Sequence, residues 1–176
     1  DFNGLNLMFE SREGILKHCS LKNAKKLGVI GDRFIRKKQP SIEAQIVNIA
    51  DEIAYINHDI DDGFRSGLLS IETLRTNALF KLCADEVCLS FPKINDAIFI
   101  NEVVRRMINL MVSDLITTST DNIKKFNPSS PEEVRAIPPL VKFSPEFFKS
   151  KQEIKAYLRK SFYEHQQVKD MTNNAQ

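Results

Sequence analysis

Acidic, phenolic and imidazole side chains between residues 51 and 62 have the types and spacing of a site for a cation or a polar ligand. The residues are Asp51, Tyr55, His58, Asp59 and Asp62. On an α-helix, which turns about 100° per residue, all five fall on one stripe. Carboxylates stacked at i+4 spacing repel one another unless a cation or a hydrogen-bonding ligand lies among them. The pattern therefore favours a hard metal ion or a polar ligand in front of this helix.

A solvated charged face is the competing explanation, and it is the more common role of such a stripe. One observation weighs against it: Lys and Arg are absent from Ile42 to Phe64, whereas solvated helices usually mix charges of both signs. His58 alone carries little weight, because a hydrogen-bonded structural histidine is the commoner case, as for His18 and His165. No HExxH, zinc-finger, P-loop or GxGxxG motif is present.

The opposite face of the same segment is apolar, as a core helix requires. It is formed by Ile46, Ile49, Ile53, Ile56, Ile60 and Phe64. We expect Asp51, Tyr55 and Asp59 to face one cleft, with the isoleucines packed behind them. Ser41 is the expected N-cap of this helix.

The other long periodic segments also have helical spacing, and strand patterns are scarce. We therefore predict an all-α chain. The predicted helices cover residues 5–17, 41–69, from 70 on, 95–126 and from 144 on; a basic loop covers 20–39 and a proline-rich connection covers 127–141.

Composition excludes several classes of protein. The chain has 176 residues, 42% of them hydrophobic and 27% charged, with a net charge of +2. No run is long and apolar enough for a membrane helix, and we expect no secretory leader. The basic stretch 22–38 contains one aromatic residue, Phe34, rather than several interleaved ones that could stack on bases, so nucleic acid is not an expected partner. Three cysteines without a CxxC pair indicate a reducing cytoplasm.

The segment from Pro40 to Gly63 closely resembles the signature of bacterial deoxyguanosine triphosphate triphosphohydrolase-like proteins. Further segments are similar to helices of that family: 4–7, Arg12 to His18, Arg106 to Ile116, 155–158 and Tyr163 to His165. The resemblance implies an all-helical HD-type bundle, of which residues 1–176 form the C-terminal portion as a single helical unit. Residues 1–69 would carry the metal and substrate helices, and residues 70–176 the C-terminal helical region.

The resemblance also implies a divalent metal ion, such as Mg²⁺ or Mn²⁺, held by two histidines and two aspartates. Asp51 matches the fourth ligand, and the other three lie upstream of the residues present here. Tyr55 and Asp59 match the substrate-pocket residues. The implied reaction is attack of water on the α-phosphate of a deoxynucleoside triphosphate, releasing deoxynucleoside and triphosphate. Beyond Asp51 we expect no catalytic residue, so this chain should be inactive without the N-terminal HD portion.

Two other functions remain open from the residues alone. The first is a non-catalytic nucleotide-binding or oligomerisation module derived from the same family; the second is a helical adaptor with an incidental acidic face. The resemblance implies a homo-oligomer, whether the family protein is an enzyme or a non-catalytic module. We also expect a larger fold around this chain, so that apolar surface at Leu5, Met8 and Phe9 is uncovered here.

Overall fold

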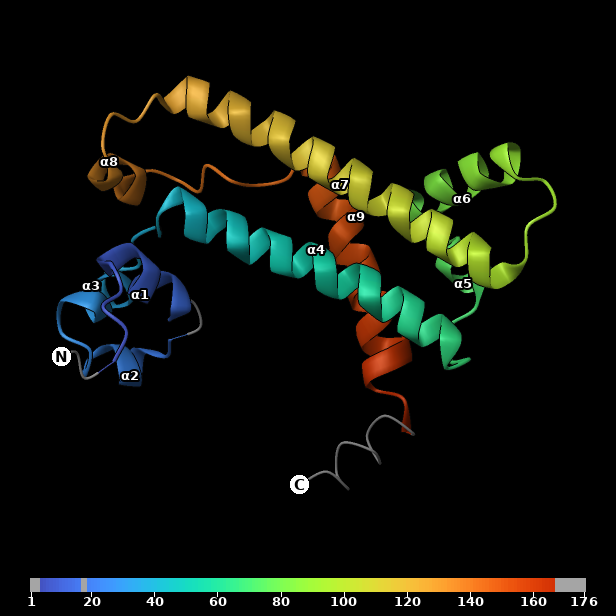
Figure 1. Ribbon diagram of the computed structural model, residues 1–176, viewed down its shortest axis with the longest axis horizontal. Coiled ribbons are helices and arrows are strands. Elements are labelled where there is room, and N and C mark those ends of the chain that lie inside the picture. Colours follow the sequence, from blue (N-terminus) through green and yellow to red (C-terminus); the bar gives the residue numbers. More distant parts are fainter. Residues whose placement is uncertain (1–3, 17–18, 167–176) are drawn as a thin grey trace. The chain divides into compact units, whose positions relative to one another are not determined.

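The computed structural model describes residues 4–16 and 19–166, and within these ranges the chain is helical and has no strand (Figure 1). The all-α prediction is confirmed. The helices are α1 (Phe9–Ile15), α2 (Leu21–Ala24), α3 (Val29–Ile35), α4 (Ile42–Arg65), α5 (Ile71–Leu74), α6 (Ala78–Ser90), α7 (Asp96–Phe126), α8 (Pro131–Ala136) and α9 (Pro145–Leu158), followed by a π-helical turn, η1 (Arg159–Tyr163).

Contacts divide the chain into two compact units, each made of two segments. Unit 1 comprises residues 1–51 and 117–142, and unit 2 comprises residues 52–116 and 143–176. One boundary between the units lies within α4, after residue 51, and another lies within α7, after residue 116. Neither coincides with the predicted division between residues 69 and 70. The description of the chain as one helical unit stays a prediction.

In unit 1, the short helices α1, α2 and α3 pack together (Figure 1). The Ser20 side chain caps α2 by accepting a hydrogen bond from the Asn23 amide. A Cβ atom at Gly31 would lie 1.9 Å from the carbonyl oxygen of Ala24, so only glycine allows α3 to approach α2 this closely.

A buried carboxylate joins three helices of the same unit. Glu13 of α1 is fully buried and pairs through Oε1 with Arg135 of α8 at 2.5 Å and with Arg33 of α3 at 2.7 Å. The Arg135 contact is a hydrogen bond, whereas the N–H of Arg33 Nε is not directed at the oxygen. Burial lowers the pKa of Arg33 below its usual value, and the neighbouring Arg135 charge adds to this effect, while Glu13 opposes it.

A buried amide fixes the connection between α8 and α9 within unit 1. Gln45 of α4 accepts hydrogen bonds from the backbone amides of Leu140 and Val141 at 2.9 and 3.1 Å. Its own amide nitrogen donates to the Pro40 carbonyl at 3.1 Å. Both the oxygen and the nitrogen of the buried Gln45 side chain therefore have hydrogen-bond partners.

Unit 2 has an apolar core contributed by four long helices. Its buried side chains include Ile53, Ile56 and Ile60 of α4, Phe80, Cys83 and Val87 of α6, Ile100, Val103, Met107 and Met111 of α7, and Ile154 and Leu158 of α9. Asn77 caps α6 and also donates to the Ser150 carbonyl of α9 at 3.0 Å. The core pattern predicted for residues 95–126 is confirmed in this part of α7.

The predicted limits of the first helix were too wide at its start. Helix α1 begins at Phe9 rather than residue 5, and Lys17, the predicted end, lies outside the described residues. Leu5 and Met8 are exposed, as expected, but Phe9 is half-buried because the Arg135 guanidinium lies over its ring, 5.6 Å from the centroid.

Three other boundaries were wrong. The basic loop contains α2 and α3, the proline-rich connection contains α8, and the helix predicted from residue 70 is two helices, α5 and α6. Side-chain caps explain where α2, α6 and α8 begin. Ser20, Asn77 and Ser130 each accept a hydrogen bond from a backbone amide at the start of a helix.

Within residues 4–16 and 19–166, none of the helices combines the length and the apolar character needed to cross a lipid bilayer.

Candidate functional site

Helix α4 carries the three residues that the sequence assigned to a site. Ser41 caps its start, with the side-chain oxygen accepting from the Ala44 amide at 3.3 Å, and the predicted N-cap is confirmed. The helix ends at Arg65, and Gly67, two residues later, adopts a φ of 73°. This left-handed conformation, which favours glycine, ends the helix four residues earlier than the sequence predicted.

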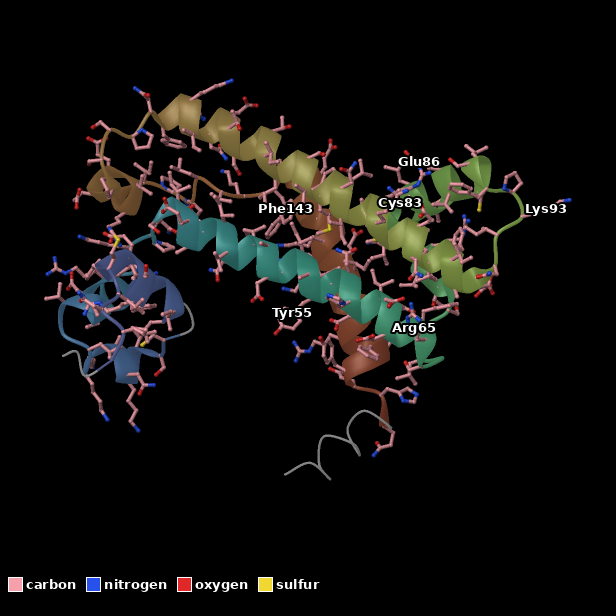
Figure 2. All side chains as sticks on the ribbon, in the orientation of Figure 1. Tyr55, Arg65, Cys83, Glu86, Lys93 and Phe143 are labelled. Atoms are coloured by element: carbon pink, nitrogen blue, oxygen red, sulfur yellow. The ribbon has the colours of Figure 1, made fainter. Side chains whose placement is uncertain are left out.

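The polar stripe of α4 is unevenly exposed. Asp51, in unit 1, is half-buried. In unit 2, Tyr55 is 62% exposed and projects outward from the helix, and Asp59 is half-buried (Figure 2). His58 and Asp62 are exposed. The assignment of Asp51, Tyr55 and Asp59 to one cleft stays a prediction.

The apolar face of α4 agrees with the prediction over most of its length. Ile53, Ile56 and Ile60 are buried, and Ile49 is half-buried. Ile46, however, is exposed, so its predicted place in the core was wrong. At this end of the helix the buried positions are instead taken by small or amide side chains, which let the α8–α9 connection pass close to the helix.

Asp59 has a partner that the sequence did not predict. The Tyr163 hydroxyl in η1 donates a hydrogen bond to Asp59 Oδ2 at 2.6 Å. Burial raises the pKa of Asp59 above its ordinary value, with a contribution from the charge of Asp62, while the Tyr163 hydrogen bond and His58 act in the opposite direction. Burial, the Asp59 carboxylate and nearby Tyr55 raise the pKa of Tyr163 to about 12.

Glu52 is matched by two cations from α9. Lys151 donates to Glu52 Oε2 at 2.7 Å, and Lys155 donates to Oε1 at 2.5 Å. The Lys151 ammonium also lies 5.2 Å from the Phe143 ring centroid and 4.9 Å from that of Phe148. Burial opposes ionisation of Glu52, but the two lysines outweigh it and lower the pKa of this carboxyl.

These contacts could not be predicted from residues 42–64, where Lys and Arg are absent. The two cations lie far along the chain, since Lys151 and Lys155 follow Glu52 by 99 and 103 positions. The lysines sit four residues apart on α9, a spacing that places both on one face of a helix. That spacing was visible in the sequence, but it did not identify which carboxylate they would meet.

A metal ion needs more ligands than α4 offers. Among the described residues, no group of three or more His, Cys, Asp or Glu side chains lies close enough together to hold one. A hard divalent cation takes about six or more oxygen ligands, some of them water. The described residues therefore do not form a metal site by themselves.

Unit 1 has an apolar cavity of about 640 Å³ beside α1 and the first turns of α4. It is lined by Met8, Glu10, Ser11, Gly14, Ile15, Ser41, Glu43, Ala44 and Val47. Met8, Ile15 and Val47 are exposed, so this wall is an uncovered apolar surface. Asp51, Tyr55 and Asp59 are not among its lining residues.

Comparison with known proteins finds relatives that match along the entire chain. A deoxyguanosinetriphosphate triphosphohydrolase-like protein of Bordetella pertussis is 46% identical over 176 residues, which is 100% of this chain and 46% of that protein. Proteins of the same description are 47% identical in Thiobacillus denitrificans, over 99% of this chain and 46% of the relative, and in Ralstonia pickettii, over 99% and 45%. No family model matches. The chain thus spans slightly less than half the length of these curated relatives.

Proposed function

Because the chain belongs by sequence to the deoxyguanosinetriphosphate triphosphohydrolase-like family, we propose that it forms part of a deoxynucleoside triphosphate triphosphohydrolase. The reaction is attack of water on the α-phosphate, with release of deoxynucleoside and intact triphosphate. The observation that carries the proposal is a similarity that covers the whole chain and therefore includes α4, the helix of Asp51, Tyr55 and Asp59.

In this proposal Asp51 is one ligand of a divalent metal ion, and Tyr55 and Asp59 contact the nucleotide. The remaining ligands lie in the part of the family sequence that this chain does not span. The exposed Tyr55 ring and the half-buried Asp59 carboxylate offer a stacking surface and a hydrogen-bond acceptor.

The partner of this chain is then the other part of a full-length family protein. The apolar cavity beside α1, with Met8, Ile15 and Val47 exposed along it, is a surface suited to packing against that part. Assembly of the complete protein into a homo-oligomer belongs to the same proposal. So does a cytoplasmic location, which suits three cysteines that are all free thiols.

The test is triphosphate release from dGTP and the other deoxynucleoside triphosphates, measured on a protein of full family length that contains this chain. We expect Asp51→Ala to abolish release, because a lost metal ligand removes metal binding. Tyr55→Ala should mainly raise KM, because it removes a ring and a hydroxyl from the pocket.

Asp61→Ala is the matched control, since Asp61 is a carboxylate of the same helix that lies off the polar stripe and pairs with Arg65 at 2.8 Å. Release that continues near the wild-type rate in Asp51→Ala would rule out its metal role. A wild-type protein without activity on any deoxynucleoside triphosphate would overturn the proposed function.

A further inference from the structure

The hydrogen bond between Tyr163 and Asp59 joins two ends of unit 2 that are 104 residues apart in sequence. The hydroxyl occupies Oδ2 of the carboxylate at 2.6 Å. The second oxygen, Oδ1, accepts no hydrogen bond from any residue that the structure describes. Within this part of the chain, Asp59 is thus held by one of its two carboxylate oxygens.

The backbone around Tyr163 places it at this position. Helix α9 does not continue as an α-helix beyond Leu158 but passes into the π-helical turn η1. The Glu164 amide donates to the Arg159 carbonyl at 3.0 Å, which is the i+5 hydrogen bond of a π-turn. Such turns insert an extra residue, change the direction of the side chains that follow, and are frequent at functional sites.

The electrostatics assign the proton in this pair. The pKa of Tyr163 is raised to about 12, so the phenol keeps its proton at neutral pH and is the donor. The groups that face Asp59 are Asp62 and His58 on α4 and Tyr163 on η1. Of these, Tyr163 and His58 favour the ionised carboxylate, and Asp62 disfavours it.

We propose that Tyr163 is a positioning residue for the nucleotide: it holds Asp59 by one oxygen, so that the other oxygen is presented beside Tyr55 to a hydrogen-bond donor of the substrate. The inference rests on the proposed function, in which Asp59 contacts the nucleotide. It adds η1, at the end of α9, to the elements that determine substrate affinity. It also explains why Tyr163, a half-exposed residue, directs its hydroxyl at the Asp59 carboxylate rather than at solvent.

Helix α9 offers a matched control in Tyr157. Its hydroxyl lies 2.6 Å from the hydroxyl oxygen of Thr73 in α5, so it also joins α9 to another helix. This partner does not titrate and has no role in the proposed site. Tyr157→Phe and Tyr163→Phe therefore remove the same atom from the same region, and only the second removes it from Asp59.

The first experiment measures the pair itself. NMR titration of the aspartate carboxyl carbons, with Asp59 assigned through Asp59→Asn, gives the pKa of Asp59. Tyr163→Phe should raise this pKa, because the hydrogen bond to the ionised form is lost, whereas Tyr157→Phe should leave it unchanged. Absorbance titration at high pH should show that Asp59→Asn lowers the pKa of Tyr163.

The second experiment measures the consequence for dGTP hydrolysis in a protein of full family length. Tyr163→Phe should raise KM by roughly tenfold, the scale of one charge-assisted hydrogen bond, with kcat little changed. The acid limb of kcat/KM should move to higher pH, because Asp59 then ionises at higher pH. The effects of Tyr163→Phe and Asp59→Asn should be non-additive in the double variant.

An unchanged Asp59 titration in Tyr163→Phe, or kinetics that match Tyr157→Phe, would overturn the inference. Failure of the proposed function is a separate result. A wild-type protein inactive on every deoxynucleoside triphosphate would overturn both the proposed function and the role of Tyr163 in nucleotide binding. In that case the titrations still decide whether Tyr163 and Asp59 are coupled.

Discussion

Each unit of the molecule contains one glutamate shared by two cations, but the two clusters differ in burial and in the kind of cation. In unit 1, Glu13 is completely buried, and the side chains of Arg33 and Arg135 are only 12% and 13% exposed. In unit 2, the Glu52 side chain is 23% exposed, Lys151 is 6% exposed and Lys155 is 46% exposed. The first cluster is closed to water, and the second opens to it on one side.

The difference in burial determines how strongly each unit depends on its cluster. A buried carboxylate between two arginines must be kept intact, because removing it leaves two cations in a medium of low dielectric constant. Guanidinium groups suit such a place, since they are weakly hydrated and stay charged. A lysine ammonium is a compact, strongly hydrated charge, so water can replace the contact that the half-exposed Lys155 makes with Glu52. Unit 1 therefore depends on its cluster more than unit 2 depends on its own.

The largest expected effect is on Glu13. Glu13→Ala should destabilise the protein by about 3–5 kcal/mol, the scale for breaking a buried ion pair by removing one partner. Urea unfolding followed by circular dichroism measures this loss. Glu10→Ala on the same helix is the control, because Glu10 is exposed and should change stability by less than about 0.5 kcal/mol. A Glu13 variant as stable as this control would show that the arginines find other partners or water.

An intermediate effect is expected at Lys151. Lys151→Met keeps an unbranched chain against Phe143 and Phe148 but removes the charge, so the cost should be about 1–2 kcal/mol. The value is lower than for Glu13 because Lys155 still contacts Glu52, whose side chain is 23% exposed to solvent. Thermal unfolding measures the difference. A loss equal to that of Glu13→Ala would contradict the contrast between the two clusters.

The smallest effect is expected at Lys155. This side chain is half-exposed, so Lys155→Ala should cost about 0–1 kcal/mol, and the cost should shrink as salt is added. Unfolding at low and high ionic strength provides the measurement. A large loss that salt does not reduce would mean that the Lys155–Glu52 contact is shielded from solvent. The Glu52 cluster would then be closed to water, as the Glu13 cluster is.

Local patterns were enough to predict the long elements. The periodic apolar positions predicted α4 and α7, Ser41 predicted the start of α4, and the helix predicted from residue 144 on is α9. The short helices α2, α3 and α8 were missed, because four to seven residues contain too little periodicity to distinguish them from a loop, and α5 was merged with α6. The serine caps of α2 and α8 were visible, but a serine before a short polar stretch is equally typical of a turn.

The spacing of side chains was enough to predict that the chain is all-α and that one helix carries Asp51, Tyr55 and Asp59 with an apolar face behind most of its length. Helical spacing is a local property, and a carboxylate stripe follows from it directly. The residues that meet that helix from elsewhere follow from the tertiary structure: Tyr163 at Asp59, and Lys151 and Lys155 at Glu52. These partners lie about a hundred positions away along the chain. Their meeting depends on how α9 packs in unit 2, and no spacing rule within a single segment contains that information.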